Sequence, residues 1–430
     1  MANNVKYTII LGCCLILTRL NVSDASKITC LDKLGVLLKF NRYQESVVVY
    51  VDTTKIQIYV YQFLVSRNGR STKLNSQFVR EVTPGLAHYK NKWSMGINQL
   101  NILLDDMVEV LPKQNWVDTP VTVLFSPEVR DLGIDDRDLS EYTLFFKKHG
   151  FQTREASNLM YLTKNKRAVL SWLSVNLVTG ALGKKNKPTS TVIDLTRESC
   201  DFAYVLSETG PKAPVEDKHL CDLQVYGKPY EIYNRGTKKL GLDNIRKLIF
   251  DKETSKSSVS FKYVSSCMSS KVTTKWIYNK TTYTITGNSS PYVDFAMCER
   301  IISSVIENIP KPPSSRGRPV YGFSLLLLRL LEGRLQVGPR TNLQEIYDFA
   351  RHVCLYPRVE DAFLCMDVTY FSVLLREFFD LKTTDPIEFS PYIGDIPIDW
   401  SFSASFINVP SDVWNPKEIQ TESDVKLSLK

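Results

Sequence analysis

The sequence predicts an α/β protein with two lobes of similar construction. An apolar strand pattern, a polar turn beginning with aspartate, and a second apolar strand occupy residues 46–64, and a similar order recurs at residues 190–206. Each of these segments is followed by mixed strand and helix patterns, as expected for a duplicated α/β fold. We therefore expect two lobes with a cleft between them.

The first lobe is expected to begin with a β-hairpin. Val, Ile and Tyr dominate residues 46–64 on both sides of a DTTK turn at residues 52–55, a composition typical of paired strands. The apolar spacing predicts helices at residues 96–110 and 139–149, with a short buried strand at residues 119–125 between them. These elements alternate as an α/β lobe requires.

The second half is predicted to contain more helices. A helix at residues 168–182 and a basic loop with a proline at residues 184–188 precede the second hairpin at residues 190–206. Residues from about 410 onward indicate a loose tail. The later segments with helical spacing are residues 293–309, 321–331, 343–354 and 368–379.

Composition excludes several classes of protein. The 430 residues suit two or three domains, and 43% hydrophobic with 23% charged residues is a folded composition. Glycine accounts for only 19 residues, below the usual level of roughly 7%, which argues against glycine-rich phosphate loops. The net charge of +8 is spread along the chain, so we expect a mild attraction for anions and no nucleic-acid partner.

The N-terminus indicates a secretory signal peptide at residues 1–25. Lys6 precedes an apolar run at residues 7–17, and Ser23 and Ala25 are the small residues of a cleavage site. The run is too short to span a bilayer, and no other segment could do so. We expect a protein without a transmembrane anchor that is secreted or resides in the ER or Golgi lumen. The alternative for residues 1–25 is a buried N-terminal helix.

Cysteines and glycosylation signals fit this compartment. After cleavage an odd number of cysteines remains, so an oxidising lumen favours disulfides and at least one leftover thiol. Spacing alone leaves the pairing open. Asn279 and Asn288 begin Asn-x-Ser/Thr sequences in a polar, strand-like stretch and are candidate glycosylation sites. The cysteines of the mature chain are Cys30, Cys200, Cys221, Cys267, Cys298, Cys354 and Cys365.

Short motifs then resemble those of the apyrases, the nucleoside triphosphate diphosphohydrolase family. Their order along residues 46–408 is most similar to the soluble secretory-pathway branch, which hydrolyses nucleoside diphosphates. The motifs are TPGL at 83–86, WVDTPV at 116–121, SWLSVNLVTG at 171–180 and FLCMDVTY at 363–370.

The resemblance implies a fold of two actin-like (ribonuclease H-like) lobes with an interlobe cleft. We place the N-terminal lobe at residues 46–163, the C-terminal lobe at 164–408 and the tail at 409–430. The resemblance also implies two disulfides, Cys267–Cys298 and Cys354–Cys365. A third pair, Cys200–Cys221, is a further candidate.

The resemblance also places phosphate-binding positions, and here the chain departs from the family. DTTK at the first loop stands in place of DAGSTGT and is interpreted as two residues shorter, whereas DLTRESCD at 194–201 replaces DLGGASTQ. The missing glycines normally let backbone amides approach phosphate oxygens. Asp52 and Asp194 would be the ligands of Ca²⁺ or Mg²⁺ if any activity remains. The phosphate-cleft positions are Asp52, Thr53, Thr54, Ser126, Arg130, Asp194 and Ser199.

The catalytic positions are also altered. Arg167 occupies the position of the catalytic base, and Asp201 replaces the glutamine that positions water. Arginine cannot act as a base near neutral pH because its pKa exceeds about 12, and loss of a general base costs about 10²–10⁴-fold in rate. The nucleobase-stacking motif becomes YGFSLLL at 321–327, which leaves Trp400 as a candidate stacking residue or a core residue.

Each of these residues also has an ordinary structural explanation. Asp52 and Asp194 could form turns, and Arg130 could belong to a surface ion pair. Ser126 and Ser199 could be turn hydroxyls.

Two functions follow from this pattern. The favoured one is an inactive apyrase relative that acts by binding a nucleotide weakly or an unidentified protein. The alternative is an active nucleoside di- or triphosphate phosphatase with a rebuilt site, in which Glu198 or Glu128 replaces the base.

The duplicated pattern also gives two geometric expectations. Asp52 and Asp194, interpreted as equivalent residues of the two hairpins, should face each other across the cleft. Arg167 or Arg197 should then pair with one of them and neutralise the cleft, because facing carboxylates repel each other. The alternative is that both arginines extend into solvent.

Overall fold

The computed structural model describes most of the chain. The expected signal peptide at residues 1–25 and the tail from residue 410 lie outside the described residues. Within those residues, no helix is both long and apolar enough to cross a membrane. The described residues are 30–37, 40–66, 72–90, 92–153, 160–183, 187–206, 216–254, 261–289, 292–332, 340–390, 392–393 and 396–409.

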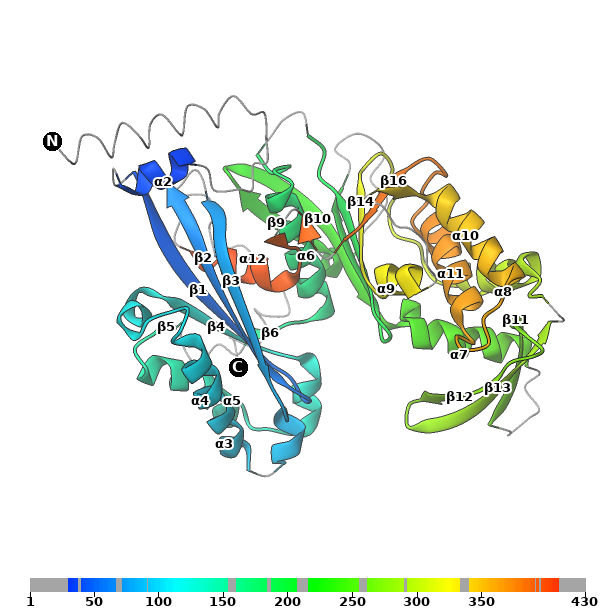
Figure 1. The fold of residues 1–430 in the computed structure, drawn as a ribbon, viewed down its shortest axis with the longest axis horizontal. Coiled ribbons are helices and arrows are strands. Elements are labelled where there is room, and N and C mark those ends of the chain that lie inside the picture. The colour runs from blue at the N-terminus through cyan, green and yellow to red at the C-terminus, as the bar shows by residue number, and fades with distance from the viewer. Residues whose placement is uncertain are drawn as a thin grey trace. The chain divides into compact units, whose positions relative to one another are not determined.

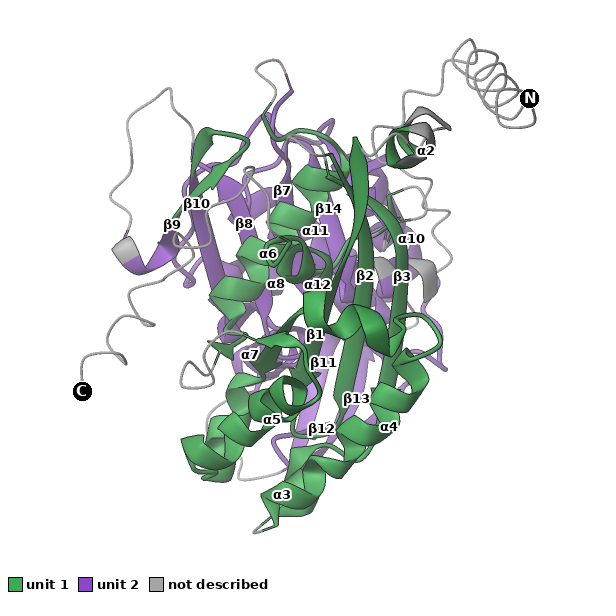
Figure 2. Cartoon of the chain, turned by 90° about the vertical axis from the view of Figure 1, so that its left-hand side faces the viewer, with its two compact units in different colours: residues 1–185, 222–230, 392–430 green, residues 186–221, 231–391 purple. Residues whose placement is uncertain are grey.

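The chain divides into two compact units, which Figure 2 shows in different colours. Unit 1 comprises residues 1–185, 222–230 and 392–430, and unit 2 comprises residues 186–221 and 231–391. The division of the sequence into two lobes, with its boundary after residue 163, remains a prediction.

Unit 1 is built around a six-stranded mixed sheet (Figure 1). Its strand order is β3-β2-β1-β4-β5, and β6 also pairs with β4. β1 and β2 form the antiparallel hairpin expected at residues 46–64, and β4 pairs with β1 in parallel, which confirms the buried strand expected at residues 119–125. The strands are β1 (Asn41–Val51), β2 (Ile56–Ser66), β3 (Thr72–Val82), β4 (Pro120–Phe125), β5 (Gln152–Thr153) and β6 (Met160–Tyr161), with a separate pair β17 (Tyr392–Ile393) and β18 (Ile396–Pro397).

Helices pack on both faces of this sheet. On one face, Leu103 and Phe146 belong to a core that includes the inward side chains of β1 and β4. On the other face, Phe402 contacts the rings of Tyr61 and Phe63. The α-helices are α2 (Cys30–Leu37), α3 (Trp93–Gly96), α4 (Asn98–Met107, expected at 96–110), α5 (Asp136–Lys148, expected at 139–149), α6 (Lys164–Val178, expected at 168–182) and α12 (Trp400–Phe406), and the 3-10 helices are η1 (Leu86–Tyr89), η2 (Lys113–Asp118) and η3 (Pro127–Leu132).

Unit 2 contains most of a seven-stranded sheet in the order β15-β16-β14-β7-β8-β10-β9; residues 222–230, which include most of β9 and the start of β10, are counted in unit 1. β7 and β8 pair antiparallel, which confirms the second hairpin expected at residues 190–206. β14 pairs in parallel with both β7 and β16 and so lies inside the sheet. The strands are β7 (Thr191–Leu195), β8 (Cys200–Val205), β9 (Leu220–Val225), β10 (Lys228–Thr237), β14 (Val320–Ser324), β15 (Thr341–Asn342) and β16 (Pro386–Phe389).

The helix expected at residues 321–331 is wrong in its first four residues. Those residues begin in β14, and helix α9 (Leu325–Glu332) starts only after Ser324, whose positive φ of 54° separates the two elements. A strand with neighbours on both sides is apolar throughout, so a short apolar run fits a buried strand and a helix equally well. Periodicity alone could not distinguish them.

The remaining elements of unit 2 are helices and a small three-stranded sheet, β11-β13-β12. Asn279 lies in the β12–β13 turn with a φ of 48°, and Asn288 lies on β13; both are exposed. Their glycosylation remains a prediction. The elements are α7 (Leu242–Glu253), α8 (Phe295–Ile306, expected at 293–309), α10 (Leu343–Leu355, expected at 343–354), α11 (Leu364–Val373, expected at 368–379) with a π-helical turn at Leu374–Phe378, the 3-10 helices Asp217–His219 and Lys238–Leu240, β11 (Lys262–Ser269), β12 (Thr273–Tyr278) and β13 (Thr281–Ser289).

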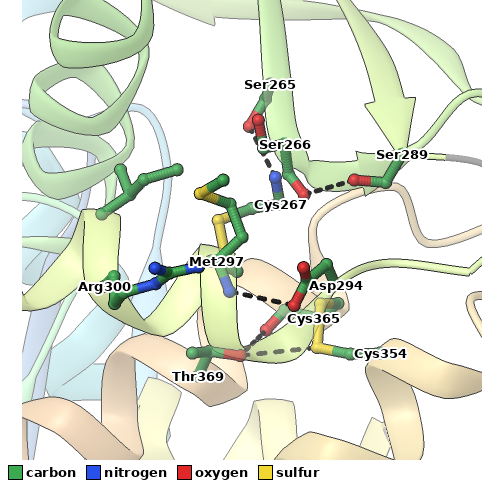
Figure 3. Close-up of a disulfide and its surroundings, with 12 residues drawn as sticks. Ser265, Ser266, Cys267, Ser289, Asp294, Met297, Arg300, Cys354, Cys365 and Thr369 are labelled. Carbon is green, nitrogen blue, oxygen red and sulfur yellow. Dashed lines mark hydrogen bonds between the residues drawn. A yellow bond between two sulfur atoms is a disulfide. The ribbon is translucent and has the colours of Figure 1, made fainter.

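Two disulfides lie in unit 2 (Figure 3). The structure contains both bridges that the resemblance implies, Cys267–Cys298 and Cys354–Cys365, each with a Cα–Cα separation of 4.8 Å. The Thr369 hydroxyl donates a 2.7 Å hydrogen bond to the Cys365 carbonyl. The first bridge joins β11 to α8, and the second joins the end of α10 to the start of α11.

The candidate third bridge is wrong. Cys200 and Cys221 are buried and are not disulfide-bonded. They lie on β8 and β9, which are separated by β10 in the sheet. Strands two positions apart are about 9.6 Å from each other, beyond the roughly 7 Å that a disulfide can span. The side chain of Cys30 lies outside the described part of the structure.

A buried chain of alternating charges runs through the helical layer of unit 2. Asp367 is fully buried and accepts hydrogen bonds from Arg246 at 2.9 and 2.6 Å and from Arg329 at 2.7 Å. Arg329 also binds both oxygens of Asp361 at 2.8 Å. At the other end, Arg246 lies 3.5 Å from Asp243. The chain therefore connects α7 to the loop closed by the Cys354–Cys365 disulfide.

Neutralising Asp367 should be strongly destabilising. Asp367→Asn leaves two buried guanidinium groups without their shared carboxylate, and breaking a buried pair in this way costs about 3–5 kcal/mol. We expect a loss of that order in the free energy of unfolding, measured by denaturant titration. Asp348→Asn is the matched control on an exposed residue of α10 and should change stability by less than about 0.5 kcal/mol. Equal unfolding curves for the two variants would contradict a structural role for the chain.

Candidate functional site

Each unit has a four-residue turn at the end of its first hairpin. In unit 1 the Asp52 amide donates to the Lys55 carbonyl at 2.9 Å. In unit 2 the Thr196 amide donates to the Ser199 carbonyl at 2.8 Å. These turns occupy the positions where the resemblance places the two phosphate loops.

Each turn is fixed to the helical segment that follows it. In unit 1 the carbonyl of the first turn residue, Asp52, accepts a 3.0 Å hydrogen bond from the Leu86 amide. In unit 2 the carbonyl of Thr196 accepts a 3.1 Å bond from the Leu242 amide. The carbonyls of the second turn residues, at 53 and 197, accept from the amides of residues 87 and 243 in the same way, at 2.9 Å each.

A glycine makes each docking possible. A Cβ on Gly85 would lie 2.1 Å from the Lys55 amide nitrogen, and one on Gly241 would lie 2.2 Å from the Glu198 carbonyl carbon. These distances leave no room for a side chain. Gly85 and Gly241 therefore lie where the backbone of the following helical segment contacts the turn, and the turns themselves contain no glycine.

The matching hydrogen bonds revise the expected equivalence of the hairpins. Asp52 begins its turn as Thr196 does, so Asp52 corresponds to Thr196 and not to Asp194. The counterpart of Asp194, two residues before the turn, is Tyr50. Both turns have four residues, and the interpretation of the first loop as two residues shorter than that of the family remains a prediction.

Tyr50 is the site residue that sequence reasoning missed. Burial is the main factor that raises the pKa of its phenol well above the usual value, and the negative charges of Asp52 and Glu128 add to the effect while Arg167 opposes it. Tyr50 is therefore a neutral phenol at neutral pH, close to three charged side chains. If the two hairpins had been aligned on their second strands, which begin at Ile56 in the first hairpin, the sequence could have shown that Tyr50 corresponds to Asp194.

The carboxylate of Asp52 is engaged by its own turn. The hydroxyl of Thr54 donates to one oxygen at 3.1 Å, and that of Thr53 lies 3.4 Å from the other. Lys55, the last residue of the turn, forms a 2.9 Å ion pair with Glu81 on β3. This arrangement agrees with the alternative that Asp52 is a turn-forming residue.

The second turn satisfies its own amides. The Thr196 hydroxyl accepts hydrogen bonds from the amides of Glu198 and Ser199 at 3.3 and 3.0 Å. A threonine here thus consumes the donors that a glycine-rich loop would present to a phosphate. Ser199 itself is fully buried, and its hydroxyl lies 3.4 Å from that of Thr196.

Asp194 and Asp201 face each other across the β7–β8 ladder, as directly paired residues of adjacent antiparallel strands. Asp201 is fully buried, and the Oδ1 atom of Asp194 is buried without a hydrogen-bond partner in the described structure. Asp194 lies in unit 2 and Asp52 in unit 1, so their approach across a cleft remains a prediction.

Arg167 lies in the first turn of α6, within the electrostatic range of Tyr50. The helix begins after Thr163, whose side chain accepts from the Lys166 amide at 3.2 Å. Lys164 lies 3.9 Å from Glu128. Arg167 thus belongs to the same cluster of unit 1 as Asp52, and its pairing with Asp52 or Asp194 remains a prediction.

Arg197 pairs with Asp243 and not with Asp194, whereas its pairing with Asp52 of unit 1 remains a prediction. Its Nε atom donates to Asp243 at 2.9 Å, whereas no ion pair joins it to Asp194 within unit 2. The alternative of an arginine that extends into solvent is also only partly right, because the side chain is tethered and yet 63% exposed. Asp243 attracts it because this carboxylate lies directly beside the turn.

The other predicted site residues of unit 1 lie around Tyr50 and the 3-10 helix η3. Ser126 is buried near the Tyr50 phenol. Arg130 is exposed and stacks on the ring of Tyr161 at 3.8 Å, in place of the expected ion pair. The ring of Trp400 packs against those of Tyr50 and Tyr59, with 5.2 and 5.6 Å between ring centroids, and is partly exposed.

Asp52, one of the two residues implied as metal ligands, fits a divalent cation poorly. Asp52 is hydrogen-bonded to turn hydroxyls, and the corresponding carboxylate position two residues earlier is a phenol. Among the described residues there is no group of three or more His, Cys, Asp or Glu side chains that could hold a metal ion. A neutral phenol is a weak ligand for hard cations such as Ca²⁺ and Mg²⁺, which prefer carboxylate oxygens.

Comparison with known proteins identifies the family. The model of the GDA1/CD39 (nucleoside phosphatase) family matches residues 39–316. The chain belongs to this family. Ectonucleoside triphosphate diphosphohydrolase 5 of Gallus gallus is 25% identical over 365 residues, which cover 82% of this chain and 85% of the relative. Nucleoside diphosphate phosphatase ENTPD5 of Homo sapiens is 22% identical with the same coverage.

Solved structures support the fold of this family member. A nucleoside triphosphate hydrolase of Neospora caninum superposes with a TM-score of 0.61 at 12% sequence identity, over 92% of this chain and 98% of the other. The predicted α/β, actin-like fold class is therefore confirmed. At this identity the likeness concerns the fold alone.

Restoring a carboxylate at residue 50 should be destabilising. Tyr50→Asp would remove a ring packed on Trp400 and place a third carboxylate beside Asp52 and Glu128, so we expect a loss of at least about 2 kcal/mol in the free energy of unfolding. Tyr50→Phe removes only the hydroxyl and is the matched control, with a loss of less than about 1 kcal/mol. Denaturant unfolding of both variants measures the difference. An aspartate variant as stable as the phenylalanine variant would contradict the packed environment described for Tyr50.

Proposed function

We propose that this member of the nucleoside phosphatase family is a non-catalytic protein that binds a nucleotide or a similar phosphate-bearing anion. The observation that carries the proposal is the second turn, where the amides of Glu198 and Ser199 donate to the Thr196 hydroxyl. Donors bonded within the turn are not directed at the charge that develops during phosphoryl transfer. Without such donors the transition state loses its main electrostatic stabilisation.

The side chains around Tyr50 support the same proposal. Arg167 is a permanent cation at the position that the resemblance assigns to the base, and Tyr50 keeps its proton at neutral pH. Neither group can accept a proton from water there. Glu128 is a carboxylate of this cluster, but it pairs with Lys164 at 3.9 Å.

The same cluster favours an anionic ligand. The first turn of α6 carries Lys164, Lys166 and Arg167 and no acidic residue. Cations are unfavourable at the positive end of a helix dipole, whereas an anion bound there would be stabilised by the dipole and the side chains together. The names of the relatives suggest the class of ligand, a nucleoside diphosphate or triphosphate.

We also propose that the protein is secreted or resides in the lumen of the secretory pathway. The two disulfides of unit 2 require an oxidising compartment to form and persist. Both candidate glycosylation residues, Asn279 and Asn288, are exposed, so a glycan could be attached to either without unfolding.

Binding without turnover is the central prediction. Purified protein should gain thermal stability with UDP, GDP or ADP in the presence of EDTA, because a ligand of the native state raises apparent stability. Phosphate release should stay at the background level with Ca²⁺ or Mg²⁺. Arg167→Ala should weaken binding by about tenfold, the value of one charge-assisted hydrogen bond. The matched control is Arg137→Ala on α5, a highly exposed residue, which should bind as the wild type does.

Two results would contradict binding without turnover. Metal-dependent release of phosphate well above background would overturn the non-catalytic proposal and favour an active phosphatase. Absence of any stability gain with all three nucleotides would overturn nucleotide binding.

Reversion of the base alone should not restore activity. Arg167→Glu returns a carboxylate to the base position, but the second turn still bonds its own amides and Tyr50 still occupies the place of a carboxylate. We expect phosphate release from UDP, GDP and ADP to remain at background with Ca²⁺ or Mg²⁺, as in Arg167→Gln, the uncharged control. Substantial turnover by the glutamate variant would show that the turns matter less than their hydrogen bonds indicate.

A further inference from the structure

We infer that Arg197 is a phosphate-binding side chain held in position by the buried charge chain of unit 2. The inference rests on the proposed function and names the group of unit 2 that would contact the ligand. It differs from a glycine-rich phosphate loop, because the donor is a side chain and not the backbone of the turn.

The tether of Arg197 is well defined. Its Nε atom donates to Oδ2 of Asp243 at 2.9 Å, and its own carbonyl accepts the Asp243 amide at 2.9 Å. Asp243 also accepts hydrogen bonds from Nε1 of Trp276 at 3.4 Å and from Nη1 of Arg246 at 3.5 Å. The residue that holds the guanidinium is thus itself held from two further sides.

The tether leaves the outer end of the guanidinium available. The Arg197 side chain is 63% exposed, and within the described residues its only hydrogen bond from the side chain uses Nε. Both Nη groups can then donate to one oxyanion. The planar guanidinium fork matches a phosphate group, and fixing it in advance reduces the entropy lost on binding.

Two backbone amides of the turn are not available to donate hydrogen bonds to a phosphate. The amides of Glu198 and Ser199 are bonded to Thr196. Glu198 is exposed beside Arg197 and opposes an anion through its charge. Arg197 is therefore the group of this turn that can attract a phosphate.

The buried chain extends the support away from the turn. From Asp243 it passes through Arg246, Asp367 and Arg329 to Asp361, in the loop that the Cys354–Cys365 disulfide closes. Buried ion pairs have little freedom to rearrange, since every charge must keep its partner. Asp243 acts here as a positioning residue, through Arg197.

The direct test replaces the guanidinium. Calorimetric titration with ADP, and separately with inorganic pyrophosphate, should show at least about a tenfold loss of affinity for Arg197→Met. Arg197→Lys keeps the charge but loses the Nε tether, so its loss should be intermediate. Arg316→Met is the matched control, because Arg316 lies in the same unit, is 56% exposed and pairs with a single aspartate; its affinity should be unchanged. If Arg197→Met lowers the affinity for both ligands equally, Arg197 contacts the phosphate group itself. If it lowers the affinity for ADP alone, Arg197 contacts the phosphates only in the pose that the nucleotide adopts.

A double-mutant cycle tests the positioning role. Asp243→Asn should weaken binding by several-fold in the wild-type background and have no effect in the Arg197→Met background, because Asp243 acts only through Arg197. A merely structural role would weaken binding equally in both. Glu198→Gln should strengthen binding by removing a repulsive charge.

The outcomes separate this inference from the proposed function. Failure of the wild-type protein to bind either probe would overturn both. Binding by the wild type that survives Arg197→Met unchanged would overturn the role of Arg197 and leave the proposed function standing. Equal effects of Asp243→Asn in the two backgrounds would overturn the positioning role.

Discussion

The hydrogen bonds between each hairpin turn and the helical segment that follows it are the constraint on which both candidate sites depend. In each unit, two consecutive backbone amides donate to the carbonyls of the first two turn residues. Gly85 and Gly241 permit this contact, because a side chain at either position would overlap the turn backbone. The conformation of the turns is therefore set from behind, and their side chains determine what they can bind.

The two turns share this docking but differ in their side chains. A threonine in the second turn bonds the amides that a glycine would leave available, and a tyrosine stands where the first hairpin would carry a carboxylate. In the proposed non-catalytic function, these side chains would leave phosphoryl transfer without oriented donors on the phosphate and without anionic ligands for a cation. Together with Arg167 they support binding in place of turnover.

Unit 2 gains much of its rigidity from electrostatics and covalent links. The charge chain is centred on the buried residues Asp367 and Arg246, and its far end lies in a disulfide-closed loop. A buried carboxylate is costly unless every lone pair is used, and here two arginines use them. Because the chain ends at Asp243, the same interactions that stabilise the helical layer also fix the exposed arginine of the second turn.

The sequence alone was sufficient for the local elements and the family. Both hairpins and the helices α4, α5, α6, α8 and α10 could be predicted, because periodicity encodes short-range structure. The two disulfide pairings came from the resemblance to the family, since cysteine spacing alone left them open. The helix expected at residues 321–331 failed because burial on both sides of β14 removes the alternation that marks a strand.

Tertiary structure decided the rest. The Cys200–Cys221 pair is excluded by the strand β10 between them. Tyr50, and not Asp52, corresponds in position to Asp194, because hydrogen bonds fix the register of the turns. Arg197 is bound by Asp243. Each of these depends on which backbone groups meet in space. Spacing along the chain does not carry that information, since residues far apart in sequence supply the partners.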